Sequence, residues 1–220
     1  MRNKLIIIIM IVGGLFLLFP PLPESYSIKT VFRATEEPVA ITRGTYGSVL
    51  TVDISFGDDE VMEWIQELKQ PYPTLFVDTD WVDRFPETVD LIKEKNIPTA
   101  LLGSNGDAYE NDVELLLNQI DIFEKTFGVK PLWFRTVDEV FTPFLHKILW
   151  ETEVNALGSS FIWSGGEIPP ATEGEIISVP HHRDKRVNLS EINRLSETRE
   201  FQTVEDVLFG TKVKKKKIPK

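Results

Sequence analysis

Charged and imidazole side chains stand at the ends of several apolar runs in this sequence. They are Asp53, Asp78 with Asp80, Asp107, Arg135 and the pair His181-His182. In an α/β protein the carboxyl ends of parallel strands form one rim, so we expect these groups to converge there. Carboxylates beside histidines can act as general acid and base or hold a metal ion. The residue after Asp53 is Ile54, whose apolar side chain can do neither.

Each of these groups also has a simpler structural explanation. Asp78 and Asp80 fit a solvated turn with a helix cap, and His181-His182-Arg183 fits a basic surface loop. His146 falls within an amphipathic segment, where we expect a structural role. Asp58-Asp59-Glu60 favours the start of a helix, because carboxylates stabilise the positive end of the helix dipole.

Short apolar runs alternate with segments of helical periodicity from residue 48 onward. The expected strands are residues 49–53, 74–77, 98–102, 132–135, 156–160, 176–179 and 199–203. The expected helices are 61–68, 86–95, a long one from Asn111 to Gly128, one opening at Thr142-Pro143, and 204–209 capped by Thr203. This alternation predicts an α/β fold, a distorted or incompletely closed (β/α) barrel of about seven parallel strands. An open doubly wound sheet is the alternative, although the glycine motifs that bind nucleotides are missing.

Composition and charge exclude several classes of function. Cysteine is absent, which rules out disulfides, thiolate zinc sites and cysteine nucleophiles. The formal net charge of −10 includes +2 from Arg2 and Lys4 and +6 from the tail lysines, so residues 5–211 carry −10 − 2 − 6 = −18. Such a body repels phosphate groups, and we expect no nucleic-acid partner.

The two ends of the chain differ from its body. Arg2 and Lys4 precede an apolar run over residues 5–19, which is typical of export. We expect residues 1–27 to be a signal peptide or an N-terminal membrane anchor, and residues 28–47 to be a linker. Residues 48–211 form the globular domain, and residues 212–220 form a lysine-rich tail. The protein is therefore predicted to be secreted, or anchored on the outer face of the cytoplasmic membrane.

Several stretches of the body share their spacing with one known family. They are Thr51-Val52-Asp53-Ile54-Ser55; Thr74-Leu75-Phe76-Val77 with Trp81-Val82 and Pro86-Glu87; Phe127-Gly128-Val129-Lys130-Pro131-Leu132-Trp133-Phe134-Arg135; and Gly174-Glu175-Ile176-Ile177-Ser178-Val179-Pro180-His181. They resemble the T-F-D-D-G, A-T-F-F-V…W-V…N-P-E, G-x-x-P-x-x-F-R and G-x-I-x-L-x-H motifs of the NodB homology domain. This is the domain of the polysaccharide deacetylases, carbohydrate esterase family 4.

The resemblance implies a distorted (β/α) barrel that removes acetyl groups from N-acetylated sugars with a divalent metal, usually zinc. Asp53 falls on the family's catalytic base, Arg135 on its arginine, and His181, or less favourably His182, on its acid. The residues at the three metal-ligand positions are Ile54, Leu102 and Gly106. None of these side chains carries a lone pair, so we expect no metal cofactor.

Three functions remain open at this stage. The leading one is a degenerate, non-catalytic deacetylase-like protein that binds cell-wall or other envelope glycan, with Trp81, Asp80 and Trp133 against the sugar. The second is an active carbohydrate hydrolase built on carboxylates, in which Asp53, Asp78, Asp80 and Asp107 hold Mg²⁺ or Ca²⁺ or form an acid–base pair. The third is a structural or partner-binding envelope protein in which the barrel is only a scaffold and the tail Lys212–Lys220 contacts anionic lipid heads or wall polymers.

Overall fold

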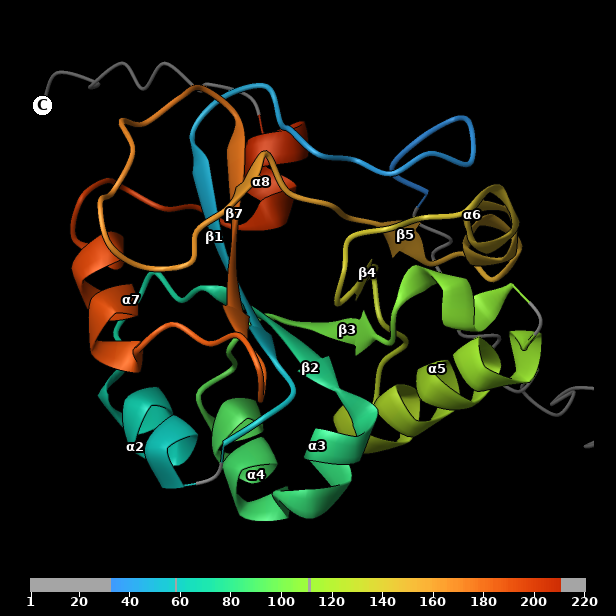
Figure 1. Ribbon diagram of the computed structural model, residues 1–220, viewed down its shortest axis with the longest axis horizontal. Coiled ribbons are helices and arrows are strands. Elements are labelled where there is room, and N and C mark those ends of the chain that lie inside the picture. The colour runs from blue at the N-terminus through green and yellow to red at the C-terminus, as the bar shows by residue number, and fades with distance from the viewer. Residues whose placement is uncertain (1–32, 58, 111, 211–220) are drawn as a thin grey trace, which may run out of the picture. The chain divides into compact units, whose positions relative to one another are not determined.

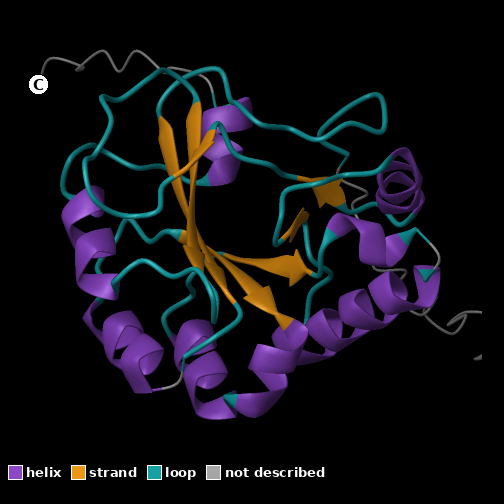
Figure 2. Cartoon of the chain, in the orientation of Figure 1, coloured by secondary structure: helices purple, strands orange, loops and turns teal. Residues whose placement is uncertain are grey.

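The computed structural model describes residues 33–57, 59–110 and 112–210, and its centre is a curled parallel sheet (Figure 2). Seven strands lie in the order β5-β4-β3-β2-β1-β7-β6, and all the strand pairs are parallel. Their bounds are β1 Ser48–Ile54, β2 Thr74–Asp78, β3 Thr99–Gly103, β4 Trp133–Thr136, β5 Asn155–Ala156, β6 Phe161–Ile162 and β7 Glu175–His181. The sheet is a distorted half-barrel with edges at β5 and β6, as the alternation of elements predicted.

Helices α7, α2, α4, α3 and α5 follow one another around the outside of this sheet (Figure 1). The helices are α2 Asp59–Glu67, α3 Thr79–Arg84, α4 Pro86–Glu94, α5 Val113–Phe127, α6 Pro143–Glu151, α7 Leu189–Ser196 and α8 Val204–Phe209, with a 3-10 turn, η1, at Gly106–Tyr109. Helix α8 packs on the other side, where its Val204 and Val207 join the apolar cluster inside the curl.

Strand β1 separates two apolar cores, because alternate residues of a strand point to opposite faces. Leu50, Val52 and Ile54 belong to the outer core beneath the helices. Val49 belongs to the inner core, and Asp53 shares that inner face by parity. All seven residues of β1 are buried. The inside of the half-barrel is therefore filled with side chains rather than open.

Most of the predicted elements and three of the predicted helix ends are confirmed. The side chains of Thr142 and Thr203 accept the capping hydrogen bonds of α6 and α8, and Pro143 occupies the first turn of α6. Gly128 ends α5 in the left-handed conformation at φ 73°. These signals are local, which is why they can be read from the sequence.

Other elements differ from the prediction. Helices α3 and α7 were not predicted, and residues 199–203 contribute only an isolated bridge from Phe201 to Ser48. The cap of α5 is Asp112, whose side chain accepts a hydrogen bond from the backbone N–H of Leu115, while the predicted start at Asn111 lies outside the described residues. Leu117 on α5 is 45% exposed. Short helices and bridges of this kind depend on long-range packing more than on local propensity.

Residues 33–47, expected as a linker, run along the body. Ile41 forms a parallel bridge to Leu157, Arg43 forms an antiparallel bridge to Glu175, and the backbone N–H of Gly44 donates to the carbonyl of Gly174. The predicted export segment and the lysine-rich tail lie outside the described residues. None of the described helices is long and apolar enough to cross a membrane.

A buried ion pair at the start of β7 tests this packing. Arg199 Nη1 lies 2.5 Å from Glu175 Oε1, and the Glu175 side chain is fully buried. Arg199→Met leaves that carboxylate buried without its cation, and we expect the free energy of unfolding to fall by about 3–5 kcal/mol.

Lys125→Met is the matched control, because Lys125 and Asp121 are also 2.5 Å apart but lie exposed on α5. We expect its effect to stay below about 1 kcal/mol. Urea unfolding measures both variants, and equal losses of stability would contradict the packing described above.

Candidate functional site

An ion pair crosses the inside of the half-barrel from β4 to β1. Arg135 Nη1 donates to Asp53 Oδ1 at 2.9 Å, and the two residues are 0% and 3% exposed. The structure thus brings together two of the residues predicted to form a site. The sequence does not reveal how deeply the pair is buried.

Arg135 is held on all sides by acceptors. Nη1 also donates to Thr51 Oγ1 at 2.7 Å, while Nε and Nη2 donate to the carbonyls of Leu157 at 3.0 Å and Gly158 at 3.2 Å. The guanidinium lies over the ring of Phe76, 4.2 Å from its centroid. Arg135 therefore ties β1 and β4 to the turn that follows β5.

Asp53 is equally committed. Its Oδ2 accepts a hydrogen bond from Ser178 Oγ on β7 at 2.7 Å, while Oδ1 accepts from Arg135. A general base must reach the proton that it removes, directly or through one water. With both oxygens bonded to buried donors, this carboxylate is placed to hold three strands together.

The two histidines at the end of β7 point to different neighbourhoods. His181 is paired in register with Ile54, so it lies on the outer face of the sheet, away from Asp53. Its Nε2 is 3.5 Å from Glu60 Oε1. His182 Nδ1 is hydrogen-bonded to Ser55 Oγ at 2.9 Å, and the Asp53 carboxylate acts to raise its pKa. The structure thus puts His182, rather than His181, within the electrostatic reach of Asp53.

Burial sets the protonation of both imidazoles. It lowers the pKa of His181, although the hydrogen bond to the Val187 carbonyl and the Glu60 charge oppose the shift. It also lowers the pKa of His182, against the opposing charge of Asp53. Both side chains therefore favour the neutral form more strongly than an exposed histidine does.

The two tryptophans predicted to bind sugar belong to different apolar cores. Trp81 is fully buried, and its Nε1–H donates to the carbonyl of Gly57 at 2.8 Å. Trp133 is 2% exposed and donates to Glu205 Oε1 at 2.6 Å. Asp80 is exposed in the first turn of α3. In this conformation both indoles serve as core residues, and neither ring is available for stacking on a ligand.

The other candidate carboxylates have separate tasks. Asp78 caps α3 by accepting from the backbone N–H of Trp81, and burial raises its pKa. Asp107 is exposed in η1. Within the described residues, no group of three or more acidic or histidine side chains is arranged to bind a metal ion.

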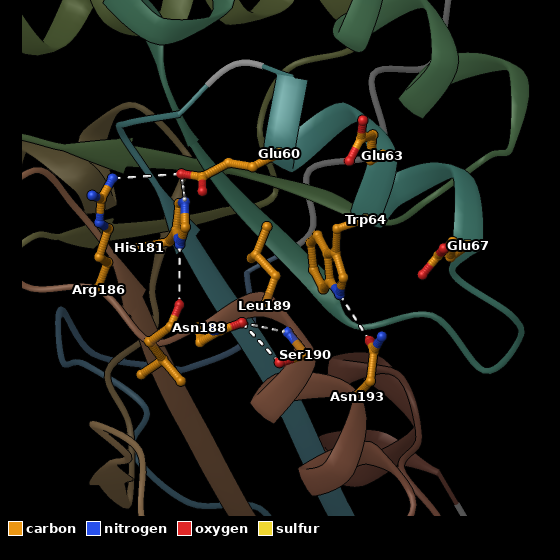
Figure 3. A pocket seen from close by; sticks show the side chains of 11 residues that line it. Glu60, Glu63, Trp64, Glu67, His181, Arg186, Asn188, Leu189, Ser190 and Asn193 are labelled. Carbon is orange, nitrogen blue, oxygen red and sulfur yellow. Dashed lines mark hydrogen bonds and ion pairs between the residues drawn. The ribbon is translucent and has the colours of Figure 1, made fainter.

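A cavity of about 490 Å³ lies between α2 and α7, with His181 beside Glu60 at one end and Glu63 and Glu67 farther along its lining (Figure 3). Its polar lining is Glu60, Glu63, Glu67, His181, Arg186, Asn188, Ser190 and Asn193. We call it the α2–α7 cavity. The sequence did not reveal it, because α7 was not predicted. The glutamates at positions 60, 63 and 67, spaced to share one side of a helix, were the available signal.

Comparison with known proteins finds the same fold in solved structures. No family model and no curated protein matches the chain. A family 4 carbohydrate esterase pseudoenzyme from Bacillus anthracis is 17% identical, with 80% of this chain and 71% of that one covered at a TM-score of 0.63. The chain has the fold of the family 4 carbohydrate esterases.

Two enzymes share this esterase fold with the chain. A peptidoglycan N-acetylglucosamine deacetylase is 14% identical over 79% of this chain and 94% of that one, with a TM-score of 0.67. A chitin deacetylase from the fungal pathogen Colletotrichum lindemuthianum is also 14% identical, with coverage of 81% and 95% and a TM-score of 0.62. The likeness to both enzymes is one of fold.

The positions that the family resemblance assigns to metal ligands do not fit a metal in this version of the esterase fold. Ile54 and Leu102 are fully buried in the outer and inner cores respectively. A Cβ atom on Gly106 would lie 2.1 Å from the backbone carbonyl oxygen of Val140. A histidine at position 106 therefore requires the backbone to move, and the residues at these positions support no reaction step through a metal.

The Asp53–Arg135 pair gives a prediction about stability. Arg135→Met leaves the buried Asp53 carboxylate without its cation and should cost about 3–5 kcal/mol of unfolding free energy. Asp53→Asn should cost less, because Glu139 Oε1 still lies 3.8 Å from Arg135 Nε. The double variant should lose about 1–3 kcal/mol less stability than the sum of the losses of the two single variants. Denaturant titration of the four proteins measures this coupling. Single losses below about 1 kcal/mol would show that the pair does not hold the sheet together.

The buried histidines predict that the protein becomes less stable in weak acid. Because their folded-state pKa values lie below the unfolded value of about 6.5, the unfolded chain takes up protons first as the pH falls. Stability is therefore fully present above about pH 6.5 and declines below it. His181→Gln/His182→Gln should flatten the profile measured by thermal unfolding between about pH 7.5 and 5.5. An unchanged slope in this variant would refute the assignment.

Proposed function

We propose that this protein is an exported, degenerate relative of the polysaccharide deacetylases that binds cell-envelope glycan without hydrolysing it. One observation carries the proposal. The esterase framework is present, while the positions that would hold the metal are occupied by Ile54, Leu102 and Gly106.

The absence of metal-ligand side chains at positions 54, 102 and 106 supports a role without hydrolysis. Three protein ligands are the usual minimum for a catalytic zinc site, and aliphatic side chains supply none. Without a metal, water keeps its pKa near about 15.7 instead of about 7. A single buried carboxylate such as Asp53 does not compensate for that difference.

The fold, the apolar N-terminal run and the acidic charge of the body support a cell-envelope glycan as the ligand. The solved structures with this fold include deacetylases of peptidoglycan and of chitin. The apolar run over residues 5–19 is the basis for export and for attachment to the membrane. The strongly acidic body of the chain argues against nucleic acid.

Hydrolysis by a carboxylate site is the second candidate, and the contacts of its residues disfavour it. Both carboxylate oxygens of Asp53 accept hydrogen bonds, from Arg135 and from Ser178, and Asp78 caps a helix. A purely structural role in the envelope is the third candidate, and it requires no ligand.

Binding and acetate release, measured on the same preparation, separate these functions. Calorimetric titration with chitin, chitosan and peptidoglycan oligomers should give saturable binding to at least one oligomer. Acetate release should stay at the blank level, both with added Zn²⁺ and with a chelator present.

Metal-dependent acetate release that the chelator abolishes would refute the non-catalytic assignment. Glycosidic cleavage products would support the carboxylate hydrolase instead. Failure of every oligomer to bind would favour the structural role.

A further inference from the structure

We infer that the α2–α7 cavity is the glycan site of this protein and that it recognises the ammonium group of a deacetylated amino sugar. This inference rests on the proposed glycan-binding function and gives it a location and a ligand chemistry. The location is the outer face of the sheet, separate from the Asp53–Arg135 pair on the inner face.

The charge of the cavity selects a cation. Glu60, Glu63 and Glu67 contribute −3 and Arg186 contributes +1, which leaves −2 with His181 neutral. Arg186 is 3.5 Å from Glu60. Within the described chain, Glu63 and Glu67 have no cation within ion-pair distance. Two carboxylates therefore line the cavity without a matching cation among the described residues.

His181 supplies the second and independent observation. Its Nδ1 lies 3.4 Å from the carbonyl of Val187, which can only accept, so Nδ1 carries the proton and Nε2 of the neutral ring is an acceptor. The residue is 2% exposed, and Nε2 has no hydrogen-bond partner.

Nε2 of His181 faces another acceptor, Glu60 Oε1, at 3.5 Å (Figure 3). Buried acceptors are normally satisfied by a donor. An ammonium group carries three N–H donors and can serve both atoms at once. The geometry at this end of the cavity therefore favours a ligand that donates hydrogen bonds and carries positive charge.

The rest of the lining suits a sugar. Asn188 and Ser190 are exposed polar groups on the α7 side, and Trp64 lies on the α2 side with its Nε1–H donating to Asn193 Oδ1 at 2.8 Å. Amides and hydroxyls can bind hydroxyl groups, while Trp64, which is 4% exposed, forms the wall of the cavity as a core residue. A volume of about 490 Å³ is within the usual range for small-ligand sites.

A neighbouring cavity gives the ligand room to extend. It measures about 690 Å³ and shares Trp64, Glu67 and Asn193 with the first, while Leu50 and Phe201 add apolar surface. A chain of linked sugars can therefore occupy both cavities, with its amine at the acidic end. This continuity favours an oligosaccharide over a single amino acid.

Acetylation of the ligand is the feature that the charge discriminates. An N-acetylated sugar carries a neutral amide and gains nothing from a net charge of −2. Hydrolysis of that amide leaves a primary amine, which is positive once protonated. The cavity is thus suited to the product of a deacetylase rather than to its substrate.

The test compares two ligands that differ only in acetylation. The β-1,4-linked tetramer of glucosamine and that of N-acetylglucosamine are titrated into the protein by calorimetry, in low-salt buffer at about pH 6.5–7, so that His181 stays neutral. We expect the amine tetramer to bind more tightly, and its affinity to fall as salt is added. Glu63→Gln/Glu67→Gln should weaken it by about tenfold or more, because two of the three negative charges of the cavity are lost.

Glu87→Gln/Glu94→Gln is the matched control, since it removes two exposed carboxylates from α4 and the same net charge. We expect this control to weaken binding much less than Glu63→Gln/Glu67→Gln does, because Glu87 and Glu94 do not line the cavity. Circular dichroism checks that both double variants are folded.

Each other outcome overturns a defined part of the proposal. Glycan binding that Glu63→Gln/Glu67→Gln does not weaken refutes this site and leaves the proposed function standing. Tighter binding of the acetylated tetramer refutes the ammonium assignment alone. Failure of all glycans refutes the proposed function as well, and tighter binding of a lysine tripeptide shows that the cavity reads a peptide instead.

Discussion

The buried ion pair between Asp53 and Arg135 is the interaction on which the rest of this structure depends. The sheet has edges at β5 and β6, and the pair ties β1 to β4 across the two strands that lie between them. Arg135 also donates to the carbonyls of Leu157 and Gly158, in the turn that follows β5. A buried guanidinium that has lost its carboxylate is costly, because the protein interior solvates an unpaired charge poorly. This cost explains how the ion pair can persist in a chain that has Ile54, Leu102 and Gly106 at the positions where the family resemblance places metal ligands.

The same constraint separates framework from chemistry. The esterase fold requires buried strands, and Ile54 and Leu102 strengthen the two cores that those strands divide. The backbone of Gly106 packs closely against that of Val140, and its N–H donates to Asp138 Oδ1 at 3.1 Å. Groups that bind a metal would have to displace this packing. Asp53, Leu102 and Arg135 are buried in the packing inside the half-barrel. Carboxylates without ion-pair partners in the described chain lie between α2 and α7 on the outer face.

Local signals explain how much of this could be predicted. The strand over Ser48–Ile54, the caps at Thr142 and Thr203 and the approach of Arg135 to Asp53 all follow from short patterns or from family spacing. The face on which His181 lies does not, because it depends on the register between β1 and β7, and a shift by one residue reverses it. The α2–α7 cavity was out of reach for a related reason. It needs α7, a short helix whose place is set by contacts with residues far away in the sequence, such as the Trp64–Asn193 hydrogen bond.

The central claim is that ligand recognition lies in the α2–α7 cavity and not beside the Asp53–Arg135 pair, and two indole N–H groups can report on these two places separately. The Trp64 Nε1–H donates to Asn193 beside the cavity, while Trp133 lies in the inner core and its Nε1–H donates to Glu205. The direct measurement is a ¹H–¹⁵N NMR titration of the protein with the glucosamine tetramer. We predict that the Trp64 indole resonance shifts with saturation while that of Trp133 stays in place. A shift of the Trp133 resonance with Trp64 unchanged would contradict this claim.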